Sequence, residues 1–231
     1  MNPPREPIVV LVSADQEWWI VKERYPSQPF QPSPFGEWVE LQAFGETLVF
    51  LHGGWGKIAA AASTQYAIQR WNPKLLVNLG TCGGFQGHIR SDEVILADET
   101  VIYDLTEQIG DPHISLATYT THLDLSWLRE PYPHPVRRTR MLSADRDLVP
   151  SDIPHLREYF GAIAADWESG AIAWVSNRNH VRCLILRGVS DLISVSGGEA
   201  YGKIEIFESG ARRVMEHLLD ALPAWLNCIQ W

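Results

Sequence analysis

Short aliphatic runs alternate along this chain with longer segments of helical periodicity, and this alternation limits the possible folds more than any other feature. A run of four or five apolar residues without polar alternation is typical of a strand buried on both faces. Such runs occupy residues 8–12, 75–79, 162–165 and 183–186, the last within a predicted strand over 182–186. Helical patterns follow at residues 57–70, 168–179 and 204–226. The alternation predicts an α/β protein with helices covering both faces of a sheet.

A predicted hairpin adds antiparallel strands to this sheet. Residues 38–42 and 47–51 flank the turn Phe44-Gly45-Glu46, and both segments have strand character. We therefore predict a three-layer α/β/α sandwich with a mixed central sheet. Because 231 residues suit one domain of ordinary size, we expect a single domain over residues 1–231.

The remaining segments are less regular. Residues 93–97 and 100–103 have strand character, whereas residues 26–36 are rich in Pro, Ser and Gln and indicate a loop. Residues 107–135 carry several prolines and histidines, and we expect a long loop with one helical turn near 123–128. Loops of this length often cover a site or form an interface.

Charge, hydropathy and cysteine spacing exclude several classes of protein. The net charge is −9 and the one basic run is residues 137–140, so we expect no nucleic-acid partner. No 18-residue apolar segment exists and residues 1–5 lack a secretory core, so we expect no membrane association. Three widely spaced cysteines show neither a disulfide framework nor a zinc motif, so we expect a cytoplasmic protein without metal or cofactor.

Three acidic residues stand at equivalent places in the predicted fold. Glu17 follows the first strand, Glu168 lies in the first turn of a helix, and Asp191 follows the strand of residues 182–186. Ligands of α/β sheets bind beyond the carboxyl ends of the strands, so these carboxylates are expected to face one crevice. Helix capping is the alternative role for Glu168 and Asp191. Ser190 is placed to orient Asp191.

Two glycine-rich segments could bring the backbone close to a ligand, and each could equally be a tight turn. The first, Gly53 to Lys57, lacks the spacing of a Walker loop and the acidic partner of a dinucleotide fingerprint. The second, Gly80 to Gly84, follows a buried strand and contains Cys82. Cys82 is compatible with a nucleophile, although a small buried thiol is the commoner case. His52 lies in a turn and is expected at the surface.

Six ordered segments resemble the nucleoside phosphorylase and nucleosidase superfamily, above all the 5′-methylthioadenosine/S-adenosylhomocysteine nucleosidases. They are Ser13-Ala14-Asp15-Gln16-Glu17, Gly54-Trp55-Gly56-Lys57, Asn78-Leu79-Gly80-Thr81-Cys82-Gly83-Gly84, Leu142-Ser143-Ala144-Asp145, Trp167-Glu168-Ser169-Gly170-Ala171-Ile172-Ala173 and Arg187-Gly188-Val189-Ser190-Asp191. The resemblance covers nearly the whole chain.

The resemblance implies a role for each acid in cleaving the N-glycosidic bond of a purine nucleoside. Asp191, held by Ser190, would protonate or hydrogen-bond N7 of the leaving base, and Glu17 would activate the attacking water. Glu168 would bind the ribose hydroxyls. Anions near the ribose suit the oxocarbenium-like character of the transition state. Further substrate contacts are implied at Trp167, Thr81, Cys82, Gly83, Asp147 and Leu148.

Water is the nucleophile that the sequence favours. In the hexameric phosphorylases a phosphate-binding arginine stands where this chain has Asn78, and an amide holds a phosphate dianion less well than arginine does. A phosphate-dependent phosphorylase stays open as an alternative, as does a futalosine-type hydrolase.

Two departures from the family pattern bear on the substrate. Trp167 replaces a methionine that contacts the ribose, and Asp147 stands in place of an aromatic residue that stacks on the purine. These changes keep open a third alternative, a nucleoside-binding protein without turnover. The family is usually dimeric or hexameric, and residues 107–135 together with the many tryptophans favour a homodimer.

Overall fold

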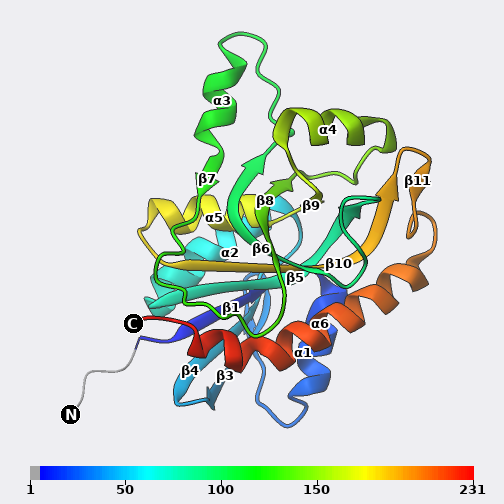
Figure 1. Cartoon of the computed structure of the whole chain (residues 1–231). Coiled ribbons are helices and arrows are strands. Elements are labelled where there is room, and N and C mark those ends of the chain that lie inside the picture. The colour runs from blue at the N-terminus through cyan, green and yellow to red at the C-terminus, as the bar shows by residue number, and fades with distance from the viewer. Residues whose placement is uncertain (1–5) are drawn as a thin grey trace.

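A mixed sheet organises residues 6–231, the part of the chain that the computed structural model describes (Figure 1). Strand β1 (Ile8–Val12) lies between β4 (Glu46–His52) and β5 (Leu75–Phe85) and is parallel to both. Strand β3 (Gly36–Ala43) pairs antiparallel with β4, and β2 (Gln31–Ser33) pairs antiparallel with β3 at the edge. The predicted hairpin and the mixed sheet are therefore confirmed.

The other half of the sheet curls until it closes on itself. Strand β10 (Cys183–Ser194) runs parallel to β5 and antiparallel to β6 (Val94–Ile102). Strand β8 (Arg137–Ser143) is parallel to β6, and β9 (Ala164–Asp166) joins β8 to the end of β5. The strands β5, β10, β6, β8 and β9 thus form a closed ring. Two short strands pair antiparallel with this part of the sheet: β7 (Thr120–His122) with β6, and β11 (Gly197–Gly198) with β10.

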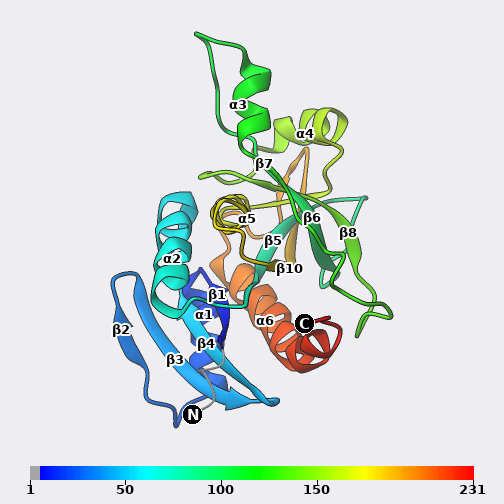
Figure 2. The same cartoon turned by 90° about the vertical axis from the view of Figure 1, so that its left-hand side faces the viewer.

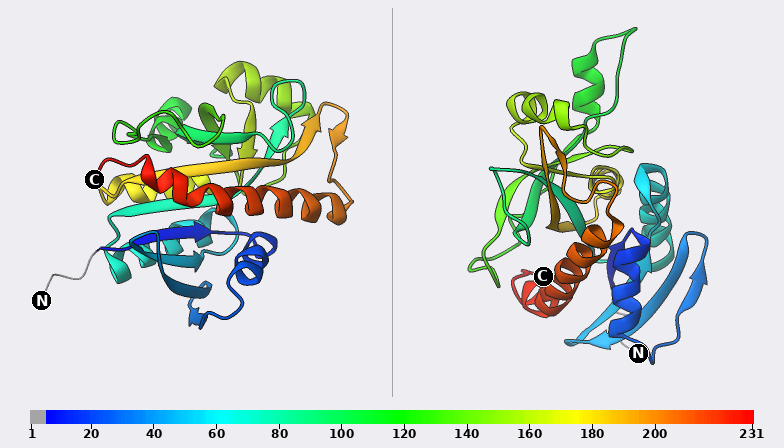
Figure 3. Two further views of the ribbon diagram at one scale, coloured as in Figure 1. Left: turned by 60° about the horizontal axis from the view of Figure 1, so that its bottom comes forward. Right: turned by 90° about the vertical axis from the view of Figure 1, so that its right-hand side faces the viewer.

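Helices cover both faces of the sheet. The helices α1 (Asp15–Arg24) and α6 (Ile204–Asn227) pack on one face, and α6 runs along β10 (Figure 3). The helices α2 (Gly56–Trp71) and α5 (Ser169–Arg178) pack together on the other face (Figure 2). All five residues of β1 are buried and alternate between the two cores, as the unbroken apolar run requires.

Two smaller helices lie beyond the closed part of the sheet. Helix α4 (Ile153–Phe160) follows a 3-10 turn at Pro150–Asp152 and covers a third apolar core. Helix α3 (Pro112–Thr118) has no buried residue and projects from the body with its loop (Figure 1). None of the helices in residues 6–231 is long and apolar enough to cross a membrane.

Three strands are longer than the sequence predicted. The glycine segment from Gly80 to Gly84 belongs to β5 instead of forming a turn, because glycine leaves room for the neighbouring side chains. A Cβ at Gly80 would overlap the Arg187 guanidinium. Likewise β10 continues through Ser190 and Asp191, with a register shift before Asp191. The predicted strands at 93–97 and 100–103 are one strand, β6, with a register shift after Ala97.

Other expectations were wrong in detail. Residues 26–36 include strand β2, where Pro32 is tolerated because the strand lies at an edge. Residues 107–135 contain α3 and β7, and no helix occurs at 123–128. The N-cap Asp111 and the following Pro112 are the local signal for the start of α3. Helices α1 and α4 were not predicted, and His52 is stacked on Trp18 instead of being exposed. The expectation about residues 1–5 lies outside the described residues.

Candidate active site

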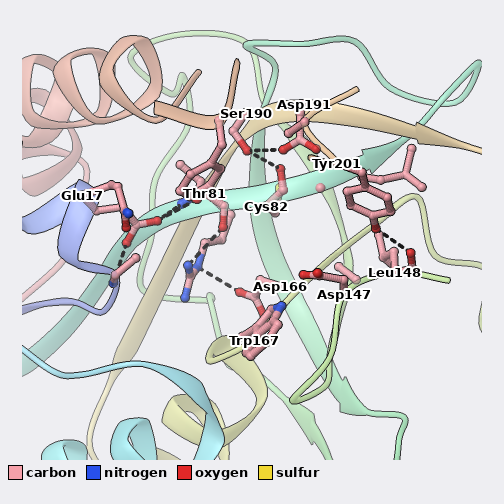
Figure 4. Close-up of a pocket in the computed structure, with 18 of the residues that line it drawn as sticks. Glu17, Thr81, Cys82, Asp147, Leu148, Asp166, Trp167, Ser190, Asp191 and Tyr201 are labelled. Atoms are coloured by element: carbon pink, nitrogen blue, oxygen red, sulfur yellow. Dashed lines mark hydrogen bonds and ion pairs between the residues drawn. The ribbon is translucent and has the colours of Figure 1, made fainter. Parts of the chain in front are cut away.

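A cavity of about 410 Å³ opens where β5 and β10 pass the N-termini of α1 and α5 (Figure 4). All ten residues singled out by the sequence line this cavity: Glu17, Thr81, Cys82, Gly83, Asp147, Leu148, Trp167, Glu168, Ser190 and Asp191. They come from five separate segments of the chain, so residues far apart in the sequence converge on one place.

Glu17 is fixed by hydrogen bonds to both of its carboxylate oxygens. It lies in the first turn of α1, a helix that the sequence did not predict. Its Oε2 accepts from the backbone N–H of Ala14 at 3.2 Å, a capping contact that explains why the helix begins here. Its Oε1 accepts from the backbone N–H of Thr81 at 2.6 Å and from Thr81 Oγ1 at 2.8 Å. Since Thr81 lies on β5, Glu17 also joins the helix start to the central strand.

Asp191 has a hydroxyl partner and a raised pKa. The Ser190 Oγ donates to Asp191 Oδ1 at 2.7 Å (Figure 4). Burial raises the pKa of Asp191 above its usual range; the Ser190 hydrogen bond opposes this shift, and the charges of Glu199 and Asp147 add to it. Asp191 is 8% exposed, and it lines the cavity. The carboxyl group therefore retains its proton to a higher pH than an exposed aspartate would.

Glu168 occupies the N-cap of α5, one position before the first turn that the sequence predicted. Its side chain does not cap its own helix. Instead, Oε1 accepts from the backbone N–H of Gly56 at 3.1 Å, and Oε2 lies 3.4 Å from Arg187 Nη2. Burial raises the pKa of Glu168 to about 7, with the nearby acids adding to the shift and Arg187 opposing it.

Arg187 and Asp166 form a buried ion pair that the sequence analysis did not single out. Arg187 is 1% exposed, and its Nε lies 2.9 Å from Asp166 Oδ2. Arg187 Nη1 also donates to the Thr81 carbonyl at 3.1 Å, and Nε lies 3.2 Å from Asn78 Oδ1. An arginine directly after the aliphatic run of β10 was the available signal, because a buried guanidinium requires acidic or carbonyl partners.

Two tryptophans form one wall of the cavity. The indoles of Trp55 and Trp167 are parallel within 4° at a centroid distance of 5.2 Å. Trp55 is 71% exposed, and Trp167 is half-buried.

Cys82 fits a buried thiol better than a nucleophile. It is 3% exposed, and burial raises its pKa well above its usual value, which opposes formation of the thiolate. Within residues 6–231, no three His, Cys, Asp or Glu side chains are grouped so that they could hold a metal ion.

Fold and cavity together define an α/β protein with a carboxylate-rich ligand site beside the central strands. The chain belongs to the phosphorylase superfamily, whose family model matches residues 7–223. The superfamily resemblance inferred from the motifs is thereby confirmed.

The similar proteins include several 5′-methylthioadenosine/S-adenosylhomocysteine nucleosidases. That of Geobacillus sp. (strain WCH70) is 26% identical over 198 residues, which cover 80% of this chain and 83% of that protein. That of Tolumonas auensis is 26% identical over 160 residues, covering 64% of this chain and 70% of that protein.

Solved structures of proteins with the same name share the fold. The Neisseria meningitidis nucleosidase in complex with methylthio-immucillin-A has a TM-score of 0.78 at 18% identity, covering 96% of this chain and 98% of that one. The S. pneumoniae protein with a transition-state inhibitor has a TM-score of 0.77 at 16% identity, covering 96% and 99%. The mixed α/β architecture is thus that of these proteins.

Proposed function

We propose that this protein hydrolyses the N-glycosidic bond of a purine nucleoside of the methylthioadenosine or adenosylhomocysteine type. The observation that carries the proposal is the presence of two differently held carboxyl groups in one cavity. Asp191 has a raised pKa and one hydroxyl partner, whereas Glu17 accepts three hydrogen bonds. Similar proteins named for this activity support the substrate class.

Asp191 is the proton donor in this mechanism. A purine leaves poorly as an anion, and a proton delivered to N7 converts it into a neutral leaving group. General acid catalysis of this kind contributes about 10²- to 10⁴-fold. A raised pKa favours this role, since the carboxyl group stays protonated closer to neutral pH. Ser190 holds the carboxyl group in one orientation through Oδ1, which leaves Oδ2 for the base.

Glu17 orients and deprotonates the attacking water. The donors from Ala14 and Thr81 fix the carboxylate in one position, so a water bound to its remaining lone pairs has a defined place. The carboxylate also stabilises the positive charge that develops on the ribose. Glu168, which is buried beside Arg187, accepts hydrogen bonds from the ribose hydroxyls in the same cavity.

The surroundings of Asn78 support water instead of phosphate as the nucleophile. Asn78 is fully buried, donates from Nδ2 to the Leu11 carbonyl at 3.1 Å and contacts Arg187 through Oδ1. The two arginines that line the cavity are both engaged by acids: Arg187 by Asp166, and Arg146 by Asp152 at 3.0 Å. No lining cation is therefore free for a phosphate dianion.

Base release from a panel of nucleosides tests this function. The purified protein is incubated with methylthioadenosine, adenosylhomocysteine, adenosine, inosine and futalosine, with and without phosphate, and the free base is measured by chromatography. We expect phosphate-independent release of the base from one or more of them. Asp191→Asn should lower this release by about 10²-fold or more.

Two results would contradict the proposal. Release that requires phosphate would make the protein a phosphorylase. Binding of a nucleoside without release, equal in wild type and Asp191→Asn, would make it a binding protein. Glu158→Gln is the matched control, because Glu158 is an exposed acid on α4 outside the cavity.

We further propose a homodimer of single-domain subunits, each a three-layer α/β/α sandwich. Helices on both faces of the sheet support the layers. Exposed apolar side chains support the dimer: Trp55 lines the cavity, Ile58 lies on α2, and Ile109 and Ile114 lie on the projecting arm around α3. Light scattering after gel filtration tests this, and a monomeric mass would contradict it.

A cytoplasmic location is supported by the absence of disulfides among Cys82, Cys183 and Cys228.

A further inference from the structure

The stacked indoles of Trp55 and Trp167 stand directly beside the carboxylate that the proposed function assigns to the ribose. Trp167 immediately precedes Glu168, and Trp55 immediately precedes Gly56. The Gly56 N–H donates to Glu168 Oε1, so one hydrogen bond ties together the two backbone segments that carry the indoles. The aromatic wall therefore borders the sugar end of the cavity, where a substituent at C5′ of a nucleoside would lie.

The groups assigned to the base lie on a different element, since Ser190 and Asp191 belong to β10. The indoles instead adjoin Glu168, which the proposed function assigns to the ribose. In this orientation their contact is with the sugar and its substituent instead of the leaving base.

The charges around the cavity distinguish the possible C5′ substituents. Five acidic side chains and two arginines line it, without a lysine or histidine in the described residues. Both arginines are paired with acids, whereas Asp147 makes no hydrogen bond or ion pair within residues 6–231. A cavity lined by an excess of one charge concentrates ligands of the opposite charge.

Indole is also the best aromatic partner for an organic cation. Trp55 is 71% exposed, so part of the pair is open to a ligand. A neutral aryl group would stack on the same surface but would gain nothing from the surrounding carboxylates. A carboxylate or phosphate group would be repelled by them. Aromatic surface and negative charge together match a cationic group.

We propose that Trp55 and Trp167 are specificity-determining residues that select a nucleoside with a positively charged C5′ substituent, a sulfonium or an ammonium group. This inference rests on the proposed function for the orientation of the nucleoside. The charge of Asp147 supplies the long-range attraction, and the indoles supply the contact.

Paired probes of nearly equal shape test the selection. 5′-Deoxy-5′-(dimethylsulfonio)adenosine differs from 5′-methylthioadenosine by one methyl group and one positive charge. Dissociation constants are measured by titration calorimetry in the Asp191→Asn background, so that the probes are not consumed. We expect the sulfonium probe to bind about tenfold more tightly than the thioether. A carboxymethylthio analogue should bind more weakly than either.

Substitutions then assign the selection to residues. Trp55→Leu should lower the sulfonium-to-thioether ratio about threefold, whereas Trp55→Phe should retain most of it because phenyl still offers an aromatic face. Asp147→Asn should lower the ratio further, and the control Glu158→Gln should leave it unchanged. Since Trp55 is mostly exposed, its substitution leaves the fold intact.

The outcomes separate this inference from the proposed function. Equal or weaker binding of the sulfonium probe would overturn the inference, even where wild type releases adenine from the thioether. A ratio that Trp55→Leu does not alter would remove the indoles from the selection. Preferred binding of the sulfonium probe by a protein that never releases a base would overturn the function and leave the inference standing. Binding of neither probe would overturn both.

Discussion

Replacing Glu168 by glutamine should flatten the pH dependence of the protein's stability. Burial raises the pKa of Glu168 from its ordinary value of 4.5 to about 7. The folded state therefore binds a proton more tightly than the unfolded state does. The resulting stabilisation is complete below pH 4.5 and is lost as the pH rises through about 7. At about 1.4 kcal/mol per pKa unit, the full effect is roughly 3 kcal/mol.

Urea unfolding at about pH 5 and about pH 8, followed by tryptophan fluorescence, measures this effect. Glu168 should make the wild type lose about 2.5 kcal/mol of unfolding free energy between these two pH values. The loss of unfolding free energy in Glu168→Gln should be smaller than the loss in the wild type by that amount, because glutamine does not titrate. The control Glu158→Gln makes the same chemical change on an exposed surface and should follow the wild type.

Two results would refute the reasoning. If Glu168→Gln shows the same loss of stability as the wild type, the carboxyl group does not titrate in this range in the folded state. If the wild type instead becomes more stable as the pH rises, with the effect absent from Glu168→Gln, Arg187 outweighs burial and holds the group ionised.

Three further expectations concern the buried polar groups and the thiols. Arg187→Met should destabilise the protein by about 3–5 kcal/mol in urea unfolding, because Asp166 would keep a buried charge without its partner; a loss below 1 kcal/mol would contradict this. In the wild type the hydrogen bond from Ser190 lowers the pKa of Asp191, so Ser190→Ala should raise that pKa and shift the alkaline limb of the pH–rate profile to higher pH. An unchanged limb would argue against Asp191 as the acid. A thiol reagent should modify Cys228 first, because the other two cysteines are buried; mass spectrometry of the labelled peptides checks the order.

The sequence predicted the parts of the fold that depend on local pattern. The apolar run of β1 and the long periodic pattern of α6 were placed correctly because each carries its own signal. Helix α1 was missed since its first turn, Asp15 to Glu17, looks polar, and its capping contact depends on Glu17 reaching back to Ala14. The true lengths of β5 and β10 depend on their pairing with each other, which no local window reveals.

The candidate site was predicted as a set of residues but not as a network. Each acid was predicted from its place after a strand or at the start of a helix, and the family resemblance implied the remaining substrate contacts. Arg187 was passed over although it stood within a quoted motif, because nothing local shows which carboxylates surround it. Trp55 was likewise placed only within a glycine turn. Its stacking on Trp167 joins two segments that are 112 residues apart in the chain. The hydrogen bond between Gly56 and Glu168 joins the same two segments.

The pairing of β5 with β10 also divides the cavity into parts with different freedom to evolve. Gly188 and Thr81 are register partners, and Asp191 pairs with Gly83, so the reacting end of the cavity is part of the hydrogen-bonded ladder. A substitution there disturbs the core of the protein as well as its chemistry. Trp55 and Asp147 lie outside the strands, where exchange costs little stability. New substrates can therefore be acquired at the rim while the ladder preserves one reaction.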